Sequence, residues 1–87
     1  MINVEKTGNE TFRVTVNSAS TTTHTVTLSD SYYKKLTGGA ITPEELIKKS
    51  FEFLLEREPN TSILRSFELP VIGKYFPEYE KLIHIQK

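Results

Sequence analysis

The sequence contains no cysteine among its 87 residues. This absence excludes disulfide bonds, zinc sites built on thiolates and cysteine nucleophiles, and it is compatible with a reducing cytosol. No hydrophobic run is long enough to cross a membrane, and the polar first residues lack the apolar segment of a signal peptide. We therefore expect a cytoplasmic protein with no membrane partner.

An excess of charge of either sign is also missing, because eleven basic residues stand against eleven acidic ones. Proteins that bind nucleic acids usually carry a basic excess, since neutralising phosphates supplies much of their affinity. A balanced chain can still present a local basic patch. The composition lowers the expectation of DNA binding but leaves it open.

Residue patterns for catalysis are scarce. His24 and His84 are far apart in the sequence, with no spacing typical of metal ligands. The glycine pair at 38–39 lacks the lysine and threonine that follow in a phosphate-binding loop. The glutamate pair at 44–45 fits a helix start better than acid–base catalysis. We expect no enzymatic activity, no catalytic residue, no metal and no cofactor.

Two stretches alternate between apolar and polar residues with the period of a half-buried strand. In residues 11–17 phenylalanine and valine alternate with polar residues, and in residues 21–28 apolar residues and His24 alternate with threonines. The polar segment between the two stretches predicts an antiparallel hairpin. Residues 2–6 are a further candidate strand.

Capping residues predict two helices. Ser29 is a suitable N-cap for a short helix that ends at the glycine pair 38–39, because glycine adopts the left-handed conformation without steric cost. Thr42, followed by a proline and two glutamates, predicts a capping box for a longer helix. That helix should run to about Glu58, because Pro59 disfavours helical geometry at the residue before it.

The longer helix has an apolar arc that is wider than packing against one sheet requires. We therefore expect it to be covered from two sides. A chain of this length has room for only a modest core, so self-association as a homodimer is also expected. The residues of this helix that we assign to a dimer or partner interface are Ile47, Phe51, Leu54 and Leu55.

The C-terminal third divides into short apolar pieces. Residues 61–67 have helical spacing, and further short helices are expected between Pro70 and Pro77 and after Pro77. An aromatic cluster in these last pieces either caps the core or anchors a protein partner, and its members are Tyr75, Phe76 and Tyr79.

Together these patterns predict one α+β domain over residues 1–87. It should contain an antiparallel β-hairpin or small sheet, a short helix, a long amphipathic helix and one or two short C-terminal helices. The C-terminal half also looks like the ending of small uncharacterised bacterial proteins, a resemblance that implies no activity.

Residues 23–58 contain a strand, a short helix, a glycine turn and a longer capped helix. This order resembles the ribbon-helix-helix family of bacterial DNA-binding proteins, which includes many antitoxins. The resemblance implies that two copies pair their strands as an antiparallel ribbon and that Thr23, Thr25 and Thr27 face DNA. These threonines cannot make the bidentate contacts by which side chains distinguish bases.

Two functional hypotheses follow. In the first, the chain is a small non-enzymatic protein–protein interaction module that forms a homodimer or binds a partner through its C-terminal aromatic region. In the alternative, it is a ribbon-helix-helix-like DNA-binding dimer, either a transcriptional repressor or an antitoxin.

Overall fold

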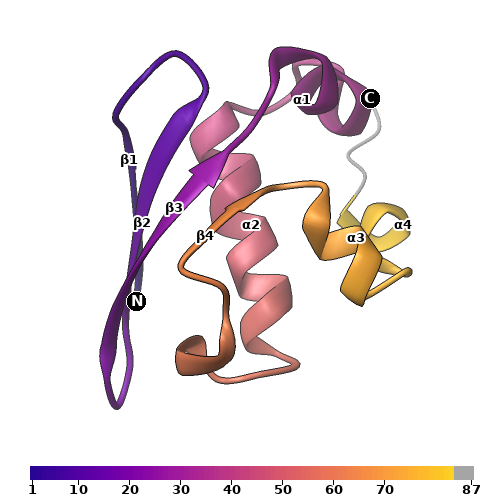
Figure 1. Cartoon of the computed structure of the whole chain (residues 1–87). Coiled ribbons are helices and arrows are strands. Elements are labelled where there is room, and N and C mark those ends of the chain that lie inside the picture. The colour runs from indigo at the N-terminus through magenta and orange to yellow at the C-terminus, as the bar shows by residue number, and fades with distance from the viewer. Residues whose placement is uncertain (84–87) are drawn as a thin grey trace.

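A computed structural model describes residues 1–83, so that His84 and the end of the expected C-terminal tail lie outside the described residues. Four strands form one sheet in the order β1-β2-β3-β4. The first three strands are an antiparallel meander, and β4 pairs with β3 in parallel (Figure 1). The strands are β1 (Ile2–Lys6), β2 (Thr11–Asn17), β3 (Thr21–Thr27) and β4 (Ser66–Glu68).

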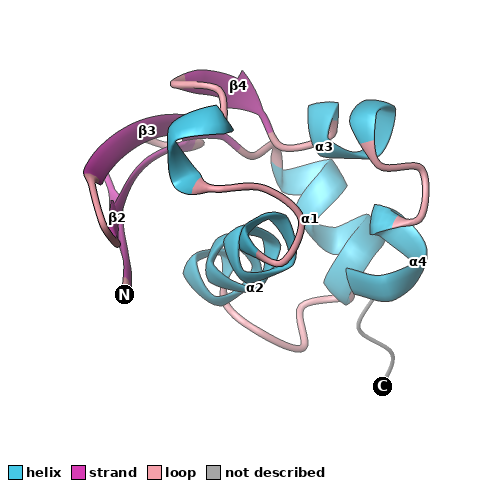
Figure 2. Ribbon diagram, turned by 90° about the horizontal axis from the view of Figure 1, so that it is seen from below, coloured by secondary structure: helices cyan, strands magenta, loops and turns pink. Residues whose placement is uncertain are grey.

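The helices of the described chain lie on one side of this sheet (Figure 2). They are α1 (Asp30–Thr37), α2 (Pro43–Leu55), α3 (Val71–Tyr75) and α4 (Tyr79–Ile83), with a 3-10 turn η1 (Asn60–Ser62) between α2 and β4. The predicted α+β class, the hairpin, the extra N-terminal strand and the short C-terminal helices are confirmed.

The predicted helix starts are confirmed by the hydrogen bonds of their capping residues. The Ser29 side chain accepts a hydrogen bond from the backbone N–H of Tyr32, and Gly38 ends α1 in the left-handed conformation at φ 61°. At α2, Thr42 and Glu45 form a complete capping box. The backbone N–H of Thr42 donates to the Glu45 carboxylate, and this bond lowers the pKa of Glu45.

The end of α2 differs from its prediction, because the helix ends at Leu55 rather than near Glu58. The backbone N–H groups of Arg57 and Glu58 both donate to the carbonyl of Leu54, which tightens the last turn. The chain then leaves the helix before Pro59.

The prediction of a helix over residues 61–67 is wrong beyond the short turn η1, because the chain extends and forms β4. The N–H of Thr25 donates to the carbonyl of Arg65, and the N–H of Leu69 donates to the carbonyl of Thr27. The backbone of this segment therefore bonds to the edge of β3 in place of forming the bonds of a local helix. Pro70 also disfavours helical geometry at Leu69.

The core lies between the inner face of the sheet and α2. The inner residues of β2 and β3 are buried, and α2 is covered by the sheet on one side and by the C-terminal helices on the other. Phe51 of α2 packs against His24 and Phe67 in tilted arrangements, whereas Phe53 contacts Phe76 and Tyr79 edge to face. The expectation that α2 is covered from two sides is therefore confirmed.

A candidate protein-binding groove

The threonines assigned to a DNA-facing strand lie on the outer face of the sheet, opposite the helices. Thr23 and Thr25 are exposed, and Thr27 is half-buried. The strand that carries them is an interior strand, with β2 on one edge and β4 on the other. Pairing of this strand with a second copy would therefore require displacement of β4.

The outer face of the sheet carries little positive charge beside these threonines. Arg13 of β2 lies 3.3 Å from the Glu5 carboxylate of β1, so its charge is already paired. The β4 residues on this face are Ser66 and Glu68, as their register with β3 shows.

Most residues assigned to a dimer or partner interface lie in the core of the single chain. Ile47, Phe51 and Tyr79 have no exposed surface, and Leu54 retains only 3%. The chain itself covers these four residues. The remaining three differ, because Leu55 and Phe76 are half-buried and Tyr75 is 65% exposed.

A shallow apolar groove lies between the C-terminal end of α2, the loop before β4, and α3. Leu64 is 46% exposed at this groove and, with Tyr75, forms its exposed apolar rim. The internal volume is only about 30 Å³. We call this feature the apolar groove, and its lining residues are Leu54, Glu58, Ile63, Leu64, Phe67, Val71, Ile72, Tyr75 and Phe76.

The loop that carries Leu64 is held to β3 by a buried hydrogen-bond network. Nδ1 of His24 donates to the carbonyl oxygen of Leu64 at 2.8 Å, so Nε2 accepts from the Thr22 hydroxyl at 2.8 Å. Asn60 donates to the same Thr22 oxygen and to the carbonyl of Ser20, each at 2.9 Å. Both ring nitrogens of His24, the Thr22 hydroxyl and the Asn60 amide nitrogen have partners, and the network fixes one wall of the apolar groove.

The opposite wall, α3, is held in place by its connection to α4. The Tyr79 hydroxyl lies 2.6 Å from Ser50 Oγ, which itself donates to the carbonyl of Leu46. The Tyr79 hydroxyl is therefore the donor to Ser50. On the same side, the Arg57 guanidinium stacks 3.7 Å from the centre of the Phe53 ring.

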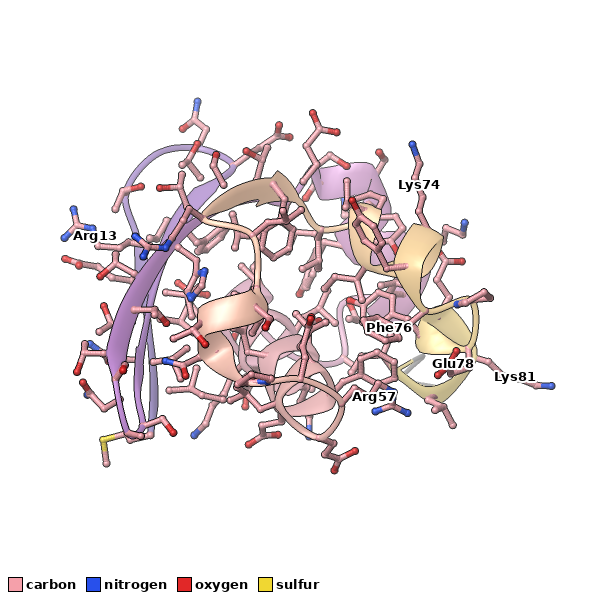
Figure 3. All side chains as sticks on the ribbon, turned by 60° about the horizontal axis from the view of Figure 1, so that its bottom comes forward. Arg13, Arg57, Lys74, Phe76, Glu78 and Lys81 are labelled. Atoms are coloured by element: carbon pink, nitrogen blue, oxygen red, sulfur yellow. The ribbon has the colours of Figure 1, made fainter. Side chains whose placement is uncertain are left out.

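Charged contacts add to this attachment of α4. Arg57 Nε lies 3.3 Å from the Glu78 carboxylate, and Figure 3 shows these two side chains near Phe76, with Lys74 and Lys81 directed outward. The Tyr32 hydroxyl of α1 donates to Glu80 at 2.7 Å. Burial, together with this hydrogen bond, raises the pKa of Tyr32 above its usual value, and burial also raises the pKa of Tyr79.

Among residues 1–83 there is no group of three or more histidine, cysteine or acidic residues placed to hold a metal ion. Within the same residues, each buried side-chain nitrogen or oxygen atom has a hydrogen-bond partner. No helix in this described part of the chain is long and apolar enough to cross a membrane.

The sequence does not single out the groove residues Glu58, Leu64 and Phe67, which lie after the end of α2, in the loop before β4 and in β4. The spacing of residues 61–67 predicts a helix for Leu64 and Phe67, and Glu58 is predicted only as the approximate end of the longer helix. The signal that was present is the density of large apolar residues between Pro59 and Pro77. The spacing of these residues in the sequence does not reveal which side chains stay exposed. Their directions are set only when the segment pairs with β3 as β4.

Comparison of the chain with known protein families, curated proteins and solved structures gives no match. The class of protein is therefore defined by the fold alone, as an α+β domain with a four-stranded mixed sheet and helices on one face.

Proposed function

We propose that this chain is a non-enzymatic protein-binding module whose docking surface is the apolar groove. The observation that carries the proposal is the exposure of Leu64 and Tyr75 at the rim of a groove lined almost wholly by apolar side chains. Leu64 and Tyr75 are exposed beside one apolar groove, so both can contact the same partner, and apolar and aromatic side chains of this kind form the centre of protein interfaces.

The size of the groove favours a protein over a small molecule as the occupant. Pockets for drug-sized ligands typically have volumes of about 300–1,000 Å³. The apolar groove encloses only about 30 Å³. It can seat the tip of one side chain, while the rim contacts the surrounding surface of a larger partner.

The energetic gain on docking comes mainly from the rim. Covering one exposed Leu64 or Tyr75 side chain contributes roughly 1.5–3 kcal/mol, less any part that is already buried. The backbone at Leu64 is fixed by its hydrogen bond to His24, and Tyr75 ends α3, which is followed closely by the buried Tyr79 of α4. Little backbone conformational entropy is then lost on binding, which favours affinity.

The free edge of β4 is a poorer docking surface than the apolar groove. The strand has only three residues, it carries the exposed Glu68, and Pro70 follows closely. Short edges with charge and proline are the features by which proteins prevent strand addition. We therefore assign binding to the side chains of the groove.

The proposal includes the homodimer and the cytoplasmic location expected from the sequence. A second copy of the chain is one partner that the groove would accept. DNA is less well supported, because the outer face of the sheet carries threonines and an already paired arginine.

In-cell photo-crosslinking tests this proposal. A photoreactive phenylalanine is placed at Tyr75 in one version of the chain and at Thr23, on the opposite face, in a matched control. We expect a protein adduct from position 75 that disappears in a background carrying Leu64→Ser. An adduct of twice the chain mass identifies a second copy. Adducts from position 23 alone, or from neither position, contradict the proposal.

A further inference from the structure

We propose that the occupant of the apolar groove is a protein segment in which one arginine or lysine stands beside a large apolar residue. This inference rests on the proposed function and adds the chemistry of the partner. In this arrangement the apolar side chain fills the groove and the cation pairs with Glu58.

Glu58 carries this argument, because it is the one charged residue among those that line the apolar groove. Its side chain is half-buried, and within the described chain it forms no ion pair. A carboxylate beside apolar surface attracts a cation more strongly than a fully solvated one does, because screening by water is weaker there.

Arg57, the cation next to Glu58 in the sequence, already has other partners. Arg57 directs Nε to Glu78 and one terminal nitrogen to the carbonyl of Phe53 and to Glu56. Its guanidinium also stacks on the Phe53 ring. Glu58 therefore has its carboxylate available to a partner.

The surface around the groove disfavours a strongly basic partner. Arg65 and Lys74 are both exposed, and they stand on the same loop and helix that form the groove walls. These two cations disfavour a run of basic residues. Long basic side chains can also place their aliphatic stem along apolar surface while the charged head reaches a carboxylate. A lone arginine or lysine with an apolar neighbour fits both conditions.

Selection from a random dodecapeptide phage library on the full chain tests this inference. The Leu64→Ser/Tyr75→Ser double variant serves for counter-selection. We expect enriched peptides in which an arginine or lysine lies within two positions of a leucine, isoleucine, phenylalanine or tryptophan. One enriched peptide is then synthesised with its basic residue intact and with glutamine in its place.

Binding of these two peptides separates the charge from the apolar contact. Glu58→Gln should weaken the basic peptide about fivefold to tenfold and leave the glutamine peptide unchanged. Glu52→Gln, an exposed carboxylate of α2 outside the groove lining, should change neither affinity. Circular dichroism confirms that each variant stays folded.

The outcomes distinguish this inference from the proposed function. Enriched peptides that are apolar but show no basic preference, or a Glu58→Gln effect equal for both peptides, overturn the inference and leave the groove as the binding site. Enriched peptides that bind the double variant equally well overturn the proposed function together with the inference. The absence of any enrichment over the double variant also overturns both.

Discussion

Nδ1 of His24 lies 2.8 Å from the carbonyl oxygen of Leu64, a residue forty positions later in the chain. This hydrogen bond connects an interior strand of the sheet to the exposed rim of the apolar groove. A fully buried side chain on β3 therefore decides where an exposed side chain of the groove stands.

Replacing His24 should destabilise the fold and disturb the groove. His24→Leu leaves the Leu64 carbonyl and the Thr22 hydroxyl without their partner, and unsatisfied buried groups cost about 1–3 kcal/mol. We expect the free energy of unfolding, measured by urea denaturation, to fall by that amount. Thr23→Ala, an exposed change on the same strand, should stay within about 0.5 kcal/mol. Equal effects of the two changes would contradict the structural role of His24.

Thr22 and Asn60 should act as one unit, because Asn60 donates to the Thr22 oxygen at 2.9 Å. In a double-mutant cycle of Thr22→Val and Asn60→Ala, we expect a coupling free energy of about 0.5–3 kcal/mol. Asn60→Ala combined with Thr42→Ala, at the far end of α2, should be additive within about 0.5 kcal/mol. Additive behaviour of the first pair would show that the network contributes nothing beyond its separate members.

Two glycines should respond to alanine in opposite ways. Gly38 has φ 61°, so Gly38→Ala forces a left-handed alanine and should cost about 1–2 kcal/mol. Gly73 lies in α3 without a positive φ, and an added Cβ would meet only Glu80 Cγ at 4.0 Å. Gly73→Ala should therefore be neutral or stabilise by about 0.4–1 kcal/mol. Thermal denaturation of both variants measures the difference, and a lower Tm for Gly73→Ala than for Gly38→Ala would refute this assignment.

The two tyrosines that attach α4 to the fold should make stability fall in alkaline solution. Their pKa values are raised in the folded chain, so the unfolded chain loses these protons first. Their contribution is complete below about pH 10, the ordinary tyrosine value, and declines as the pH rises further. In urea denaturation, the Tyr32→Phe/Tyr79→Phe variant should lose less stability than wild type as the pH rises above about 10, and an equal loss of stability would count against the two hydroxyls.

Much of the local structure could be predicted from the sequence. Ser29, the glycine pair 38–39 and the Thr42 capping box specify the starts and stops of α1 and α2 by contacts within a few residues. Strict alternation specifies β2, β3 and which of their faces is buried. These features depend on short-range hydrogen bonds and side-chain periodicity, which can be recognised in the amino-acid sequence.

The tertiary structure alone decided the rest. The spacing of residues 61–67 suits a helix, yet β3 offers an open edge and His24 captures the Leu64 carbonyl, so the segment becomes β4. The apolar face of α2 suits an interface as well as a core, and the sheet and α4 cover most of it. Each choice depends on residues about forty positions away or on whole faces that meet only after folding. The sequence determined the elements by local bonding, and long-range packing determined which apolar residues remain exposed at the groove.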